Sequence, residues 1–388
     1  RKLERAIGIR QVATGSAFLS LLFLGVGVAI VGATARAVGL SASEIGYLVA
    51  AQNVGLGIAV VLGGALADRY PKPRVLTVGL LMLGTSFAVL YRSESFAVNL
   101  AVMLLMGAGM GTAEAVTDAL LLEMHTKHES RLVTINHFFV SIGSVIITVY
   151  LMALELDWSA SLVQVAAALG VLVVVSLLLK PPRHAIPDTG GTVLRNLSTD
   201  IGLILLFLAG MGAIGIGVGS AGVITTFATE LRGIDTDSAQ VILALFLSGL
   251  AVGRIVVGLV GTHRYPGRTA AIAALLAVVI SILFYLVPLP DAALPVLASA
   301  MGLTVAPLLP LTIAVAGLRY RTVAGTAMGI VKLSIPIGGI VIPGLIGAVS
   351  DFASFPAALY LFPVSAAVVV AATLIGERRV KRSAATPE

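Results

Sequence analysis

Cysteine is absent from the 388 residues, and charged side chains are scarce. The lack of cysteine excludes disulfides, thiolate metal sites and a cysteine nucleophile. Asp, Glu, Lys and Arg together make up 11% of the chain, whereas 58% of it is hydrophobic and the mean hydropathy is +1.05. Because this balance is far from that of a soluble globular domain, we predict an integral membrane protein.

The motifs of several enzyme classes are also missing. The sequence contains no Gly-Lys-Thr phosphate loop, no metal-ligand cluster and no nucleophile triad. We therefore expect neither ATP hydrolysis, nor a bound cofactor, nor an enzyme. The first apolar run has no small-residue cleavage site before the next one, so no cleavable signal peptide is expected.

Long continuous apolar runs fill most of the chain. Lipid offers backbone groups no hydrogen-bond partners, so a spanning segment must be a helix or part of a closed barrel. The runs are about 18–28 residues long, where a barrel would show alternating segments of roughly 10, so we predict helices. The twelve predicted spans are residues 11–36, 43–68, 74–92, 96–124, 132–154, 159–179, 200–228, 238–262, 269–288, 292–316, 322–349 and 355–376.

Basic residues are distributed unevenly between the two sets of loops. Both termini and the loops after even-numbered spans hold 20 of the 25 lysines and arginines, and the opposite side holds only Arg36, Arg92 and Arg232. The positive-inside rule then predicts a multi-pass protein of the cell membrane with both termini in the cytoplasm. The net charge of +6 thus reflects topology, and no nucleic-acid partner is expected.

A polar, proline-containing segment lies at the middle of the chain. We predict an N-terminal six-helix bundle at 1–180, a cytoplasmic linker at 181–199 and a C-terminal six-helix bundle at 200–388. An internal echo supports this division, because RYPKPR at 69–74 recurs as RYPGR at 264–268, an offset of 195 against a half-length of 194. Duplicated halves are typical of transporters that bind their substrate near the membrane midplane. The alternative is a chance likeness of two basic turns.

The stretch GALADRYPKPR at residues 64–74 resembles the loop signature G-x-L-A-D-R-x-G-R-K/R between the second and third helices of the major facilitator superfamily. The chain departs from it where Pro71 replaces glycine. The resemblance implies an all-α membrane protein with twelve transmembrane helices in two pseudo-symmetric six-helix bundles, working by alternating access. It also implies that Asp68, with Arg69 and Arg74, gates the cytoplasmic side and stabilises the outward-open state. The alternative is that these residues are only solvated topology determinants.

Two carboxylates, Glu114 and Asp118, interrupt an apolar span. Four residues apart, they lie on one face of a helix, which should look into a cavity. A charge near the middle of a bilayer costs at least roughly 2.5–3.5 kcal/mol, so it needs a partner or a task. Two carboxylates in a low dielectric cannot both ionise cheaply, so we expect the pKa of at least one of them to rise toward neutrality. They are the predicted proton-coupling residues; the alternative is that they are static partners of cations on neighbouring helices.

The same region is similar to one branch of that superfamily. The patterns GxGxxExxxD at 109–118 and NHFFxxxG at 136–143 resemble the fourth and fifth helices of the fucose:proton symporter branch. This resemblance implies that Glu114 takes part in proton coupling. Asp118 departs from the usual Asn, so that a second titratable group replaces a neutral sugar-binding amide.

Two cations are also placed at mid-depth, Arg254 in the eighth span and Lys332 in the eleventh. At ~1.5 Å per helical residue, Glu114, Arg254 and Lys332 all lie about 12–16 Å from the cytoplasmic helix ends. The two cations either form salt bridges that break and reform during transport, or bind an anionic substrate. A further alternative is that Arg254 snorkels to the cytoplasmic surface. The other predicted substrate-binding residues are Gln52, Asn53, Asn136, His137 and Thr226.

These features together predict a secondary active transporter that works by alternating access. We expect proton-coupled symport of a small polar solute, either a sugar or an organic anion, by a monomer in the lipid bilayer. One alternative is a multidrug:proton antiporter, although such exporters usually carry a Gly-Pro signature in the fifth helix that residues 143–148 lack. The others are an amphiphile or lipid transporter of the same fold and a non-transporting receptor.

Overall fold

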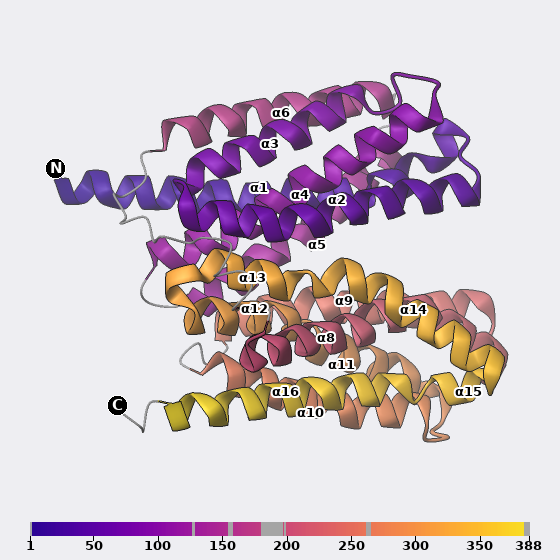
Figure 1. Cartoon of the computed structure of the whole chain (residues 1–388). Coiled ribbons are helices and arrows are strands. Elements are labelled where there is room, and N and C mark those ends of the chain that lie inside the picture. The colour runs from indigo at the N-terminus through magenta and orange to yellow at the C-terminus, as the bar shows by residue number, and fades with distance from the viewer. Residues whose placement is uncertain are drawn as a thin grey trace. The chain divides into compact units, whose positions relative to one another are not determined.

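The computed structural model describes residues 2–125, 129–153, 158–179, 197, 199–260 and 265–383, and the regular secondary structure of these residues is helical throughout (Figure 1). The helices of the first half are α1 (Lys2–Val38), α2 (Ala42–Arg69), α3 (Lys72–Val89), α4 (Phe96–Met124), α5 (Glu129–Ala153) and α6 (Trp158–Leu178). Those of the second half are α8 (Ile201–Thr226), α9 (Thr236–Val260), α10 (Pro266–Tyr285), α11 (Leu294–Val305), α12 (Leu308–Arg319), α13 (Ala324–Lys332), α14 (Ser334–Phe352), α15 (Phe355–Ala358) and α16 (Leu361–Ser383). Short turns are the π-helix η1 (Phe227–Leu231) and the 3-10 helices η2 (Asp291–Ala293) and η3 (Arg321–Val323).

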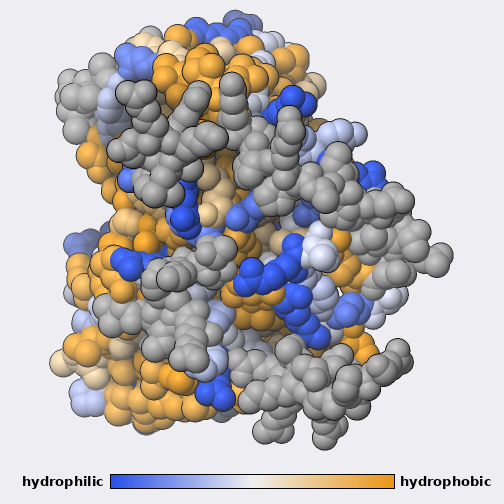
Figure 2. Space-filling model, turned by 90° about the vertical axis from the view of Figure 1, so that its left-hand side faces the viewer, coloured by the Kyte–Doolittle hydropathy of each residue, from blue (hydrophilic) through white to orange (hydrophobic). Residues whose placement is uncertain are grey.

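Each predicted span coincides with a helix or with consecutive helices, which confirms an all-α membrane protein. Eleven segments of the described chain are long and apolar enough to cross a membrane. The α3 helix falls outside this set because Lys72 and Arg74 lie in its first turn. Large apolar side chains such as Val171 and Leu178 of α6 are exposed, and Figure 2 shows broad hydrophobic areas in orange beside hydrophilic ones in blue. Lipid, and not water, is the solvent that suits such a surface.

Prolines break the tenth and eleventh spans. Pro307 has no N–H to donate to the carbonyl four residues earlier, and the chain leaves α11 at Val305 and enters α12 at Leu308. In the same way Pro336 offers no donor to the carbonyl of Lys332, which is the last residue of α13. The second break therefore places Lys332 at the C-terminal end of a helix inside an apolar span.

Contacts divide the chain into two compact units. Unit 1 comprises Arg1–Glu129, Ile135–Arg195 and Gly317–Leu333, and unit 2 comprises Ser130–Thr134, Asn196–Ala316 and Ser334–Glu388. Unit 1 thus holds α1 to α4, most of α5, α6 and α13, and α4 packs in it against α2, α3 and α13. In unit 2, α9 packs on α11, while α16 packs on α8 and α10. The predicted bundle boundaries at 1–180, 181–199 and 200–388 stay a prediction, and nearly all of 181–199 lies outside the described residues.

Glycines allow α2 and α4 to cross in very close contact. A Cβ on Gly107 would lie 2.9 Å from the backbone nitrogen of Leu56, and a Cβ on Gly111 would lie 2.9 Å from that of Val60. Small residues of this kind let transmembrane helices approach closely enough for backbone packing. The crossing holds α4 in the interior of unit 1, so that its residues from Gly109 to Leu122 are all buried.

Replacing Gly107 with alanine is expected to lower the free energy of unfolding by about 1–3 kcal/mol, because the added methyl group overpacks this crossing. The measurement is thermal unfolding of the purified protein in detergent. The matched control is Gly170→Ala in α6, where a Cβ would meet no heavy atom within 4 Å. That control is expected to match or slightly exceed the wild-type melting temperature, since alanine favours the helix. Equal melting temperatures for the two variants would contradict the close crossing.

Candidate functional site

The two carboxylates of α4 face the interior of unit 1. The exposed fraction is 4% for Glu114 and 0% for Asp118. Because they lie one helical turn apart on one face, a single neighbouring side chain can reach both. Both side chains are thus buried within unit 1, and the cavity that the sequence predicts beside them stays a prediction.

Asp118 receives three hydrogen-bond donors. Lys332 Nζ lies 2.8 Å from Asp118 Oδ2, and His137 Nε2 lies 3.0 Å from the same oxygen. Asn136 Nδ2 donates to Asp118 Oδ1 at 2.7 Å and to Thr117 Oγ1 at 3.2 Å. Charge-assisted donors around a carboxylate favour its ionised form. We call Glu114, Asp118, Asn136, His137 and Lys332 the buried charge cluster.

Lys332 joins both carboxylates from the end of α13. Its side chain is 0% exposed, and its Nζ lies 3.9 Å from Glu114 Oε1 and donates to the main-chain oxygen of Glu114. The C-terminal end of a helix carries partial negative charge, which favours a lysine in the last turn. The carboxylate of Glu114, at 3.9 Å, has a longer and weaker contact with Lys332 Nζ than that of Asp118, at 2.8 Å.

The cluster holds two carboxylates against one lysine and one histidine. With neutral His137 its net charge is −1, and one added proton makes it neutral. The Oδ1 atom of Asn136 is buried and accepts no hydrogen bond from the described residues. A buried acceptor without a donor is costly, so this atom favours a polar ligand or water next to the cluster. Chemically, the arrangement can hold a proton and change its charge without exposing a carboxylate to lipid.

Two of the predicted substrate-binding residues lie apart from this cluster in unit 1. Gln52 is 5% exposed, and its Nε2 donates to the main-chain oxygen of Gly27 at 2.8 Å. Asn53 is half-buried, and its Nδ2 donates to the main-chain oxygen of Val49 at 2.9 Å. In this structure Gln52 links α2 to α1, and Asn53 bonds within its own helix.

The remaining predicted substrate-binding residues belong to unit 2. Arg254 lies on α9 and is half-buried, and Thr226 is the last residue of α8 and is also half-buried. Of the two predicted cations, only Lys332 therefore shares a unit with Glu114 and Asp118. Asn136 and His137, by contrast, are both brought onto Asp118.

Asp68 caps a helix from another part of the chain. The α13 helix begins after Val323, which has no side chain able to cap it. Asp68 Oδ1 accepts from the backbone nitrogen of Gly325 at 2.8 Å, and Oδ2 accepts from the backbone nitrogen and Oγ1 of Thr326 at 2.7 and 2.6 Å. A carboxylate at this end satisfies unpaired N–H groups and complements the helix dipole.

The two arginines predicted to act with Asp68 are exposed, Arg69 at the end of α2 and Arg74 in the first turn of α3. Another basic residue of the same loop, Lys72, forms an ion pair with Glu123 of α4. Gly325 allows α13 to approach α2 closely, since a Cβ on this residue would lie 2.5 Å from the main-chain oxygen of Gly64. Asp68 is thus the residue of the loop signature that joins α2 to α13.

Sequence reasoning missed three contributors. Thr117 bridges the cluster by accepting from Asn136, and Thr326 provides two of the three donors to Asp68. Glu123 pairs with Lys72. A signal existed for Thr326, because the stretch Val-Ala-Gly-Thr at 323–326 starts a helix without a capping residue of its own. For Thr117 the sequence holds no such signal, since a threonine inside an apolar helix is also a common packing residue.

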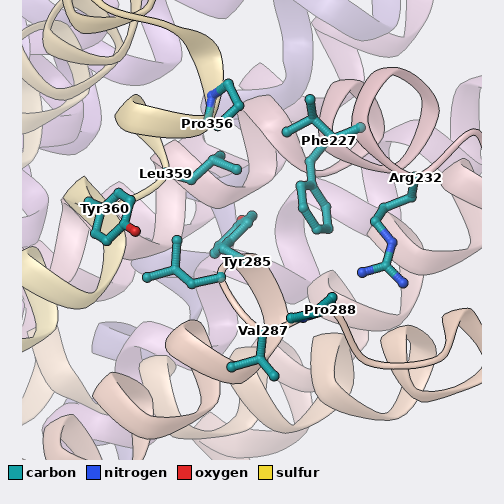
Figure 3. Close-up of a pocket in the computed structure, with 10 residues that line it drawn as sticks. Phe227, Arg232, Tyr285, Val287, Pro288, Pro356, Leu359 and Tyr360 are labelled. Atoms are coloured by element: carbon teal, nitrogen blue, oxygen red, sulfur yellow. The ribbon is translucent and has the colours of Figure 1, made fainter.

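Unit 2 contains a separate pocket of about 380 Å³ where α8, α10 and α15 end (Figure 3). Its lining is largely aromatic and apolar, with Phe227, Tyr285 and Tyr360, and among the described residues Arg232 is the one charged residue that lines it. Arg232 Nη2 lies 2.6 Å from Asp291 Oδ1, so this cation is already paired. None of the predicted site residues lines this pocket.

Comparison with known proteins agrees with this architecture. A gallate transporter of Pseudomonas putida is 28% identical over 316 residues, which span 66% of this chain and 66% of that protein. A crystal structure of the E. coli fucose:proton symporter FucP superimposes with a TM-score of 0.81 at 15% identity, over 96% of this chain and 99% of that one. The human organic anion transporter MFSD10 (TETRAN) gives a TM-score of 0.70 at 16% identity, over 95% and 99%.

The likeness to the fucose:proton symporter extends over the whole fold, in line with the resemblance of residues 109–143. At these identities it establishes the fold alone. The family model of the Major Facilitator Superfamily matches residues 12–227 and 203–388, which is nearly the entire chain. The chain therefore belongs to the Major Facilitator Superfamily, whose members are transporters and not enzymes.

Proposed function

We propose that this protein is a proton-coupled symporter of a small organic anion, with Glu114 as the main proton carrier. The observation that carries the proposal is the buried charge cluster, in which two carboxylates share one lysine. Buried ionisable groups of a transport protein mark ion pathways and proton relays by default. The orientation with cytoplasmic termini, the cell membrane as location and the monomeric state remain predictions.

Glu114 is assigned this role because protonating it disturbs the cluster least. Its Oε1 is 3.9 Å from Lys332 Nζ, whereas Asp118 accepts from Lys332, His137 and Asn136 at 2.7–3.0 Å. A proton on Asp118 Oδ2 would oppose Lys332 and His137, and a proton on Oδ1 would oppose Asn136. A proton on Glu114 leaves Lys332 balanced by Asp118 alone.

The charge of the cluster gives the sign of the coupling. With net charge −1 the cluster repels an anionic solute, and one proton on Glu114 removes that repulsion in a low dielectric. Proton binding and anion binding therefore favour each other, and this coupling is reciprocal. The same proton would matter less to a neutral sugar, whose binding depends mainly on hydrogen bonds.

The choice of an organic anion over a sugar is supported by the relatives. The Pseudomonas putida relative, at 28% identity, is named as a transporter of gallate, which is an aromatic carboxylate. The similar structure of MFSD10 is that of an organic anion transporter. The fucose symporter supports the sugar only through its fold. Lys332 is engaged by Asp118, and a substrate-binding role for Arg254 of unit 2 stays a prediction.

Glu114→Gln is expected to abolish accumulation driven by a pH gradient while keeping counterflow, because the neutral amide permits solute exchange but carries no proton. The measurement uses proteoliposomes with radiolabelled gallate and, in parallel, fucose. The control is Asp351→Asn, which removes an exposed carboxylate at the end of α14 and should leave both activities unchanged. Undiminished accumulation in Glu114→Gln would rule out its coupling role, and accumulation of fucose alone would rule out the organic anion.

A further inference from the structure

Unit 1 contains a polar pocket at the end where α1 and α3 finish and α2, α4 and α6 begin. Its volume is about 540 Å³, within the range of small-molecule sites. Residues 38–40 of the α1–α2 turn form part of its wall, and the side chains that characterise it are Glu44, Tyr91, Arg92, Glu94 and Trp158. We call it the end pocket. It lies outside the buried charge cluster, and none of its lining residues belongs to the proposed transport site.

Tyr91 is held in a strained backbone conformation at this pocket. Its φ is 57°, and it is the one non-glycine residue of the described chain with a positive φ. Asn99, 7% exposed, imposes this conformation, since its Oδ1 accepts from the backbone nitrogen of Tyr91 at 2.9 Å. Its Nδ2 donates to the main-chain oxygens of Ser93 and Ser95. Strain of this kind persists only where the surroundings impose it, and it is concentrated at ligand sites.

The strained turn brings two aromatic rings together at the pocket. The rings of Tyr91 and Trp158 have centroids 5.7 Å apart and an interplanar angle of 83°. Trp158 is the one tryptophan of the chain. Aromatic rings attract cations through the negative potential of their faces, and tryptophan does so best.

The charges of the end pocket also favour a cation. Glu44 is fixed as part of a capping box, with Oε2 accepting from the backbone nitrogen and Oγ of Ser41 at 2.8 and 2.6 Å. Glu94 is exposed. Arg92 is the single cation among the described lining residues, and its Nε donates to the main-chain oxygen of Ala88 near the end of α3. The described lining of the end pocket thus contains two carboxylates and one guanidinium, and its net charge is negative.

The wider surroundings have the same sign of charge. In the first half of the chain, the loops on the predicted outer side contain two basic residues, Arg36 and Arg92, and four acidic ones, Glu44, Glu94, Glu155 and Asp157. A surface with such an excess of one sign raises the local concentration of ions of the opposite sign. Cations are therefore enriched at the mouth of the end pocket.

The pocket of unit 2 in Figure 3 provides an internal comparison. It also lies where helices of its unit end, and its Tyr285 follows Tyr91 by 194 residues, the half-length of the chain. There, however, the described lining residues include no carboxylate, and Arg232 forms an ion pair with Asp291. Diverging helix ends can thus account for a hollow in each unit, but not for the two acids and the strained tyrosine of the end pocket.

We propose that the end pocket binds a small organic cation that carries an aryl or alkyl group. The ammonium group lies near Glu94 and Glu44, and the apolar group packs on Tyr91 and Trp158. This site is separate from the transport path, and its occupancy does not depend on the identity of the transported solute.

The test follows the fluorescence of Trp158 in the purified full-length protein. Because no other tryptophan is present, the signal reports this pocket alone. The probe is benzyltrimethylammonium, and neutral benzyl alcohol and anionic benzoate serve as ligands of similar size. We expect a saturable change with the cation and none with the other two.

Three variants decide whether charge recognition causes this change. Glu94→Gln is expected to weaken cation binding by roughly three- to tenfold, the effect of losing one partly exposed charge pair, and Arg92→Gln is expected to strengthen it. Glu230→Gln, an exposed acid in unit 2, should leave the affinity unchanged. Thermal unfolding verifies that each variant is folded. The proposal is overturned if benzoate or benzyl alcohol produces the saturable change, if no ligand does, or if Glu94→Gln binds the cation like the wild type.

Discussion

Replacing Lys332 with methionine is expected to lower the free energy of unfolding by about 3–5 kcal/mol, because it leaves a fully buried carboxylate without its cation. Asp118 is 0% exposed, and it would keep only His137 and Asn136 as donors. Methionine has a similar length, so lost packing contributes little. The measurement is thermal unfolding in detergent, in which the variant should melt well below the wild type.

The double variant Lys332→Met with Asp118→Asn separates charge from packing. Removing the buried negative charge along with its partner should restore most of the lost stability, because paired buried charges add little beyond what an uncharged replacement provides. A Lys332→Met protein that melts like the wild type would show that the ion pair with Asp118 is not formed.

Asp68→Ala is expected to destabilise the contact between α2 and α13 by about 2–3 kcal/mol, since it removes the acceptor of three hydrogen bonds from Gly325 and Thr326. The chain contains no cysteine, so Ala327→Cys introduces its single thiol. Ala327 lies on α13 and is 0% exposed. Maleimide labelling at this position should accelerate by roughly thirtyfold or more when Asp68 is replaced, if labelling follows the opened population.

Asp68→Asn is the matched control for this experiment. Asparagine keeps one acceptor oxygen but loses the charge that complements the N-terminus of α13, so its labelling rate should fall between those of the wild type and Asp68→Ala. An intermediate rate would support the gating role that the loop signature implies for Asp68. Labelling at one rate in all three proteins would show that the capping contact does not hold α13 against α2.

The sequence predicted some members of the buried charge cluster but not the contact that joins them. Glu114 and Asp118 are recognisable because charge is rare in apolar spans, and their spacing of four places them on one face. His137 and Asn136 come from the next helix along the chain. Lys332, by contrast, lies 218 residues from Glu114, and the sequence left open whether it pairs with the acids or binds an anion. Only the packing of α13 on α4 joins them.

Gln52 illustrates the opposite case. Its predicted role in substrate binding stays a prediction, but nothing in the sequence indicated that its Nε2 donates to the main-chain oxygen of Gly27. A soluble helix shows its buried side by hydrophobic periodicity, but a helix in lipid is apolar all round. The sequence therefore contains little information about which face of α2 looks toward α1.

The sequence by itself determined the membrane class, the twelve spans and the superfamily. Hydropathy and span length are local properties that add up along the chain, and the loop signature at 64–74 is contiguous. Only the tertiary structure decided that Asp118 holds Lys332, that Asp68 caps α13 and that Tyr91 meets Trp158. These contacts depend on how apolar helices rotate and cross. The lipid-facing and buried faces of such helices have similar compositions, so the sequence does not distinguish them. Which face is buried is decided only when the helices pack.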